Sequence, residues 1–206
     1  MKKYKDYQIV LLALLSLLLN FGGKIVADRF RLPMWLDSFG TFLMAYVVGP
    51  FCAAIVGAAA NILYGFLDPV SFAYSITSIA IALLVGYLAK YGWMRNLFKT
   101  MSLSVMLTGV SVVISCILNV IFYNGMTNNY WGDGIIAMLQ HWNQPRWLQI
   151  IAGEFYVDFV DKVITLGALY FGIKIYRKIK IYLPDFLVLQ EEKKPEELDA
   201  SSSPGA

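Results

Sequence analysis

The chain has 206 residues, of which 58% are hydrophobic and 15% charged, and its mean hydropathy is +0.60. Soluble domains usually carry about 25% charged residues, and a domain this small cannot hide such an apolar excess in one core. The composition therefore excludes a cytosolic enzyme, a disulfide-stapled secreted domain and a disordered chain, and the net charge of +3 is too balanced for a nucleic-acid partner.

Apolar runs of helical length recur along the chain and predict an all-α integral membrane protein. A membrane-spanning helix needs about 20 mostly apolar residues. The pair Gly49-Pro50 ends a short second helix, because proline disfavours helix at the residue before it. We expect a six-transmembrane-helix bundle within a membrane domain at 1–189, with helices at 7–26, 36–49, 51–67, 71–91, 102–123 and 148–173. The short second and third runs also fit a re-entrant pair.

Two stretches lie outside these helices. Residues 124–147 form a long outer loop between the fifth and sixth helices, and the centre of this loop, 134–142, has the pattern of a short amphipathic helix. Residues 190–206 are polar, acidic and rich in Ser and Pro, which is typical of a disordered tail.

The distribution of basic residues predicts the orientation of the bundle. Six spans place both termini on one side, where ten Lys and Arg residues gather. The other side keeps four: Lys24, Arg29, Arg31 and Arg146. Positive charge favours the cytoplasmic side, so we expect a multi-pass plasma-membrane protein whose N and C termini are cytoplasmic.

The sixth run contains four ionisable residues, and each is a functional candidate because charge inside a bilayer is costly. A spacing of i, i+4, i+7 and i+11 gives one helical face to Glu154, Asp158, Asp161 and Thr165. In a structural interpretation, Lys162 forms an ion pair with Asp161, or with Asp158 one turn earlier. In a functional interpretation, Glu154 and Asp158 bind a ligand.

Asp37 opens the second helix and has two interpretations of equal weight. One is an N-cap that accepts hydrogen bonds from the amides of Phe39 and Gly40, worth about 1 kcal/mol. The other is ligand contact. Its neighbour Trp35 lies at the expected outer interface, where tryptophan is also common as an anchor.

Buried amides and outer aromatic residues form a second group of candidates. Asn61 and Tyr64 share a face near the outer end of the third helix, and a buried Asn needs a partner on another helix or on a ligand. The same question applies to Asn20 and Asn119. Asp68-Pro69 has the pattern of an N-cap followed by proline at the first position of the fourth helix.

The outer loop carries four aromatic side chains: Tyr130, Trp131, Trp142 and Trp147. They stack on a planar ligand or form an interfacial belt, and the sequence leaves both interpretations open. In the third helix, Ala53, Gly57 and Asn61 form a ridge of small residues that packs inside the bundle or docks a partner.

Motifs for catalysis, for metals and for nucleotides are missing. His141 is the only histidine, and there is no His-Glu-x-x-His, Gly-x-Ser-x-Gly or phosphate-binding loop. We therefore expect no catalytic residues, no cofactor and no metal, and any use of ATP requires another protein. An intramembrane hydrolase using Glu154 and Asp158 would lack a nucleophile or a metal.

Three segments resemble the substrate-binding S components of energy-coupling factor (ECF) transporters. These are LDSFGTFLMAYVVGP at 36–50, GAAANILYGFLDPVSFAYSITSIAIALLVGYLA at 57–89 and VDKVITLGALYFGIK at 160–174. The elements around Asp37 and at Asp161-Lys162 are the most specific, and the resemblance covers most of 7–183.

The resemblance implies a lipid-embedded protein that binds a vitamin, a vitamin precursor or a related micronutrient near its outer face. The loops between helices 1 and 2, 3 and 4, and 5 and 6 would close this pocket. Its partners would be a transmembrane T subunit and two cytoplasmic ATPases. The docking surface on the first helix often carries Ala-x-x-x-Ala in this family, whereas this chain has Ala13 and Ser16.

The residues expected on pocket-facing elements combine carboxylates with aromatic rings and suit a small, planar, polar or cationic heterocycle similar to thiamine, pyridoxine or a nucleoside. They are Trp35, Asp37, Asn61, Tyr64, Tyr74, Trp131, Glu154 and Asp158. The alternatives are a non-catalytic membrane sensor or scaffold with the acidic tail as its effector, a solitary carrier, and a membrane enzyme that acts on lipid or peptide.

Overall fold

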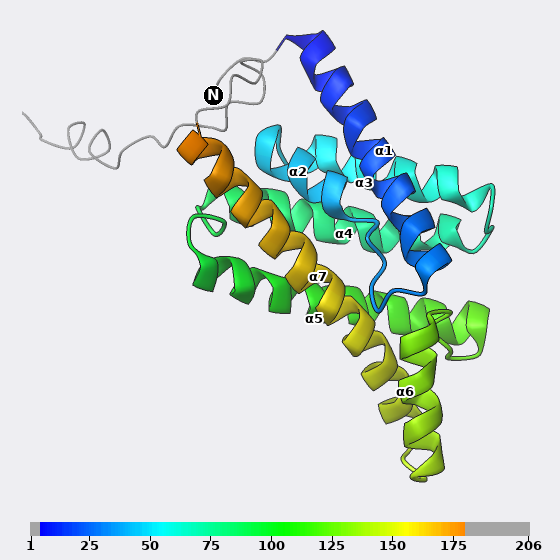
Figure 1. Cartoon of the computed structure of the whole chain (residues 1–206). Coiled ribbons are helices and arrows are strands. Elements are labelled where there is room, and N and C mark those ends of the chain that lie inside the picture. Colours follow the sequence, from blue (N-terminus) through cyan, green and yellow to red (C-terminus); the bar gives the residue numbers. More distant parts are fainter. Residues whose placement is uncertain (1–4, 180–206) are drawn as a thin grey trace, which may run out of the picture.

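The computed structural model describes residues 5–179, with side chains up to 175. The expected tail at 190–206 lies outside the described residues. Within them the chain forms seven helices and no strand (Figure 1): α1 Asp6–Phe30, α2 Phe39–Val47, α3 Pro50–Gly65, α4 Ser71–Lys90, α5 Leu97–Tyr123, α6 Tyr130–His141 and α7 Arg146–Ile179. The all-α class is confirmed, and α6 occupies the outer loop where the sequence predicts an amphipathic helix.

Two helix starts differ from the prediction, one because of a capping hydrogen bond and one because of the local backbone conformation. Helix α5 begins five residues earlier than expected, because the side chain of Asn96 accepts the amide of Lys99 at 2.8 Å and caps the helix. Helix α2 begins at Phe39 rather than at Leu36, because Leu36 has a left-handed backbone with φ of 54°.

Three of the described helices are long and apolar enough to cross a membrane: α1, α4 and α5. Helix α3 is apolar but shorter. Large apolar side chains of α1 are exposed along most of its length, including Leu11, Leu14 and Leu18. An exposed surface of this kind is stable against lipid and not against water, so the molecule is a membrane-associated protein.

Close approaches of backbone hold the short helix α2 in the bundle. A Cβ on Gly40 would lie 2.0 Å from the carbonyl oxygen of Ser16, so α2 meets α1 at a position that only glycine fits. Asn20 of α1 accepts the Gly40 amide at 2.7 Å and donates to Thr41 Oγ1 at 2.7 Å. Ser16 and Asn20 are both buried in this contact, which gives Asn20 a helix-packing partner.

The small-residue ridge of α3 faces the interior. Ala53, Gly57 and Asn61 are buried, and a Cβ on Gly57 would lie 3.2 Å from Thr41 Oγ1 and 3.3 Å from Ser78 Cβ. The ridge therefore packs against α2 and α4 inside the bundle, which decides between the two interpretations of its sequence.

Buried apolar side chains are more frequent toward one end of the bundle interior, and buried polar side chains toward the other. The apolar core includes Leu103 and Leu107 of α5, together with Leu166 and Leu169 of α7. On the same two helices, most of the side chains buried beyond Leu107 on α5 and before Leu166 on α7 are polar, with Val112 and Val157 among the exceptions. Figure 1 shows α5 and α7 crossing the bundle together, with α6 beside the first turns of α7. The functional candidates therefore gather at one end.

Candidate functional site

A cavity of about 370 Å³ lies at the polar end of the bundle. Its walls come from α1, α3, α4, α5 and α7, from the segment 31–38, which connects α1 to α2, and from residues 127–130 at the start of α6. Ligand-binding pockets in proteins typically measure about 300–1,000 Å³. The cavity is therefore large enough for a small organic molecule.

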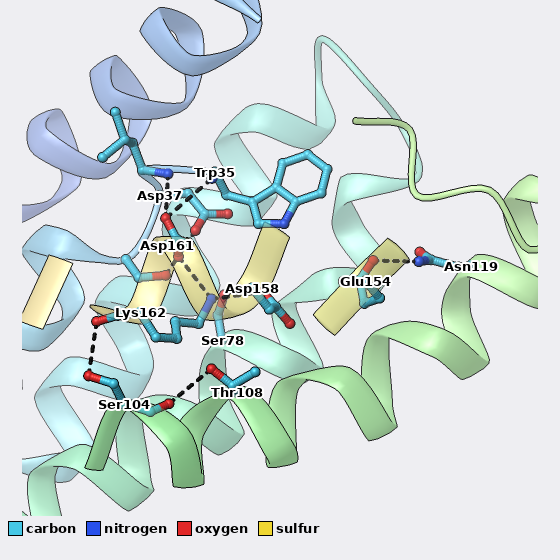
Figure 2. Close-up of polar contacts among 12 residues, drawn as sticks. Trp35, Asp37, Ser78, Ser104, Thr108, Asn119, Glu154, Asp158, Asp161 and Lys162 are labelled. Carbon is cyan, nitrogen blue, oxygen red and sulfur yellow. Dashed lines mark hydrogen bonds and ion pairs between the residues drawn. The ribbon is translucent and has the colours of Figure 1, made fainter. Parts of the chain in front are cut away.

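Helix α7 supplies a buried cluster of charges to this cavity. Lys162 Nζ lies 3.0 Å from Asp158 Oδ1 and 2.9 Å from Asp161 Oδ2 (Figure 2). The ion pair expected from sequence between Asp161 and Lys162 is present, and Asp158 shares the same amine. Asp158 and Lys162 line the cavity, whereas Asp161 stands behind them.

Asp161 holds the segment 31–38 in place, although the two are about 125 residues apart in the sequence. Its Oδ1 accepts the backbone amide of Leu36 at 2.8 Å and that of Trp35 at 3.2 Å. These bonds join α7 to a segment that has no regular structure of its own. They therefore position Trp35 and Asp37, which both line the cavity.

Glu154 belongs to a second polar chain on the cavity wall. Asn119 Nδ2 of α5 donates to Glu154 Oε2 at 2.7 Å, and the hydroxyl of Tyr74 on α4 donates to Asn119 Oδ1. Three helices are thus connected by hydrogen bonds through side chains that are mostly buried. Glu154 and Tyr74 line the cavity, so a ligand there would meet both.

Asp37 is not the N-cap of α2, so that interpretation of the sequence is wrong. Ser38 occupies the cap position without a side-chain hydrogen bond to the helix, and the Gly40 amide bonds Asn20 instead. Because the helix begins at Phe39, the cap position falls on Ser38, one residue after Asp37. Its carboxylate accepts the hydroxyl of Ser38 at 2.8 Å and faces the cavity.

Asp68-Pro69 also differs from its expected role. Helix α4 begins at Ser71, so Pro69 does not occupy its first position. Asp68 accepts the amide of Val70 at 3.3 Å and the hydroxyl of Ser71 at 3.1 Å, and thereby closes the turn before the helix. The start of α4 therefore lies about half a helical turn later than an N-cap at Asp68 would place it. Asp68 itself lines the cavity.

Asn61 and Tyr64 of α3 reach the cavity with partners on other helices. Asn61 Nδ2 donates to Ser78 Oγ on α4 at 2.6 Å. The Tyr64 hydroxyl donates to Asp28 on α1, and Lys24 Nζ lies 4.3 Å from the centroid of the Tyr64 ring. Both side chains therefore serve helix packing and cavity lining at once.

Trp131 is the one predicted binding residue that does not line the cavity. Its indole Nε1 donates to the carbonyl of Arg31 at 2.8 Å, and its side chain is about half exposed. The neighbouring Tyr130 lines the cavity instead, with the Arg31 guanidinium 5.4 Å from its ring centroid. Trp142 and Trp147 are exposed and lie outside the cavity wall.

Sequence reasoning missed two polar stripes of the cavity wall. Lys24, Asp28 and Arg31 line it from the end of α1, at i, i+4 and i+7. Ser111 and Ser115 line it from α5, four residues apart on the same face. Helical spacing of polar residues was the available signal in both cases.

The arrangement suits binding. Within the described residues, no group of three or more His, Cys, Asp and Glu side chains has the geometry to hold a metal ion. The wall offers carboxylates, hydroxyls and rings around one space. Comparisons of the chain with protein-family models, with curated proteins and with solved structures find no match.

Proposed function

We propose that this chain is the substrate-binding S component of an ECF-type transporter, which imports a vitamin, a vitamin precursor or a related small heterocycle. In this proposal six helices span the plasma membrane, both termini are cytoplasmic and the cavity opens toward the outside. The chain binds its substrate and catalyses no reaction.

The observation that supports the proposal most is the cavity itself. It combines buried carboxylates on α7 with the rings of Trp35, Tyr64 and Tyr74 in a volume of about 370 Å³. At about 30 Å³ per molecule in liquid, a dozen waters fill such a space. A planar heterocycle with several polar substituents matches this volume and this mixture of contacts.

The energy source is the second part of the proposal. Uphill transport requires coupling to ATP, and the chain has no phosphate-binding loop. A separate T subunit with two cytoplasmic ATPases would supply it. The exposed apolar side chains of α1 would then meet lipid or the T subunit, and the mismatch of Ala13 and Ser16 to the family's docking pattern leaves that surface to be mapped.

Co-purification tests the coupling directly. The chain is co-expressed with the T subunit and both ATPases of its own cell, and the complex is isolated in mild detergent through a tag on the T subunit. We expect one copy of this chain for each T subunit and each pair of ATPases. A variant lacking residues 190–206 is expected to assemble equally well.

Two results would contradict the proposal. If the T subunit and ATPases stay together while this chain elutes alone, the sensor and the solitary carrier become the better interpretations. If assembly depends on residues 190–206, the tail is an effector and the scaffold interpretation gains support.

A further inference from the structure

The buried charges of α7 do not balance. Glu154, Asp158, Asp161 and Lys162 are each at most 2% exposed, and they are the fully buried charged side chains within the described residues. Three buried carboxyl groups are thus present for one buried amine, which contacts two of them, Asp158 and Asp161. Removing charge from water costs several kcal/mol per ion, and the cost is recovered only when a partner of opposite charge is present.

The other basic residues of the cavity wall do not correct this imbalance. Lys24 Nζ lies over the ring of Tyr64, and Arg31 lies over the ring of Tyr130. The first contact joins α1 to α3, and the second joins the end of α1 to α6. Asp37, in contrast, adds a further carboxylate beside the α7 cluster. The cluster therefore has negative charge in excess.

One carboxylate oxygen in the cluster lacks any partner. Asp158 Oδ1 accepts Lys162, but Asp158 Oδ2 is buried and has no hydrogen-bond donor. Buried carboxylate oxygens normally accept hydrogen bonds, so an orphan of this kind indicates a missing donor. Figure 2 shows Asp158 between Lys162 and Glu154, and both carboxylates line the cavity.

The size of the space distinguishes an organic cation from a metal ion. A cavity of about 370 Å³ far exceeds the volume of a single ion, and the described residues hold no cluster with metal-ligand geometry. Residues four apart on a helix have Cβ atoms about 5–6 Å apart, so one nitrogen-containing group can contact Glu154 and Asp158 together.

We infer that the cavity binds an organic cation with at least two N–H donors, an amidinium-like group, whose charged end lies between Asp158 and Glu154. Its ring would pack against Trp35 and Tyr74, which line the same cavity. The inference rests on the proposed function and narrows its substrate from polar heterocycles to positively charged ones.

Three probes of one shape and different charge test the inference: benzamidinium, benzamide and benzoate, at equal millimolar concentration. The measurement is the thermal unfolding of the detergent-purified protein. Asp158→Asn is the test variant, because Asn keeps an oxygen for Lys162 and Asp161 remains in place. Asp6→Asn, at an exposed position in the first turn of α1, is the matched control.

We expect benzamidinium alone to raise the melting temperature of the wild type and of Asp6→Asn. Asp158→Asn should need at least about tenfold more benzamidinium for the same shift, because a charge-assisted hydrogen bond is lost. Without a probe, Asp158→Asn should melt at or above the wild-type temperature, since it removes surplus negative charge. A purely structural role of Asp158 predicts a lower one.

Equal stabilisation by benzamide or benzoate would overturn the inference, as would unchanged benzamidinium binding by Asp158→Asn. Either result would leave the proposed binding function standing. Absence of stabilisation by all three probes would count against the inference. If no small molecule is recovered from the purified wild type either, the proposed function fails with it.

Discussion

At the scale of single residues, Lys162 decides whether the polar end of the bundle is stable. Its amine contacts Asp158 and Asp161, and Asp161 in turn binds the amides of Trp35 and Leu36. One ammonium thus supports two buried carboxylates and, through them, the segment that closes one side of the cavity. No other buried basic side chain is present in the described residues.

Lys162→Met should therefore lower the free energy of unfolding by about 3–5 kcal/mol, the cost of leaving a buried carboxylate unpaired. Thermal unfolding in detergent measures the effect. Lys174→Met on the same helix is the control, because Lys174 is exposed and should change stability little. Equal melting temperatures for the two variants would show that the α7 cluster does not need the amine.

At the scale of elements, the contact between α1 and α2 depends on a glycine, Gly40, which has no side chain to separate the two backbones. A Cβ on Gly40 would lie 2.0 Å from the Ser16 carbonyl oxygen, whereas a Cβ on Gly109 in α5 would meet nothing within 4 Å. Both glycines lie inside helices, where alanine is favoured by about 0.5–1 kcal/mol.

Gly40→Ala should therefore destabilise the protein by at least about 1–3 kcal/mol, since overpacking separates α2 from α1. Gly109→Ala should be neutral or stabilising. Denaturant or thermal unfolding in detergent compares the pair. If Gly40→Ala is as stable as Gly109→Ala, the backbones of α1 and α2 do not approach as closely as the structure has them.

The helices themselves were predictable from the sequence, whereas some of their boundaries were not. Apolar runs predict all six long or core helices, because burial in lipid or protein imposes them locally, and amphipathic spacing predicts α6. The start of α2 was not predictable in this way, because it depends on Asp161 binding amides about 125 residues earlier in the chain. Local patterns carry no information on such contacts.

Candidate site residues follow the same division. The face of Glu154 and Asp158 was readable from helical spacing, because a charged stripe on an apolar helix must point inward. Their partners were not, because Asn119 and Tyr74 come from two other helices. Trp131 was expected to bind the ligand, but its neighbour Tyr130 lines the cavity instead. A shift of one position along a helix turns a side chain to another face, and the sequence pattern did not resolve this difference.

At the scale of the whole molecule, the cavity is closed at one end by the apolar core. Leu103 and Leu107 of α5 and Leu166 of α7 are fully buried between the cavity and the end of the bundle where α5 begins. A ligand that leaves the cavity at that end would have to pass these packed side chains. Release at that end therefore requires a rearrangement of these side chains or of the helices that carry them.

Mass spectrometry of the small molecules released by denaturing the purified protein tests the central claim, that the cavity holds a small-molecule substrate. Wild type and Glu154→Ala are incubated with a deproteinised cell extract, washed and compared. We predict one compound in near-equimolar amount from the wild type and none from Glu154→Ala, which should still unfold cooperatively. Equal recovery from both proteins, or no compound from the wild type, would contradict the account.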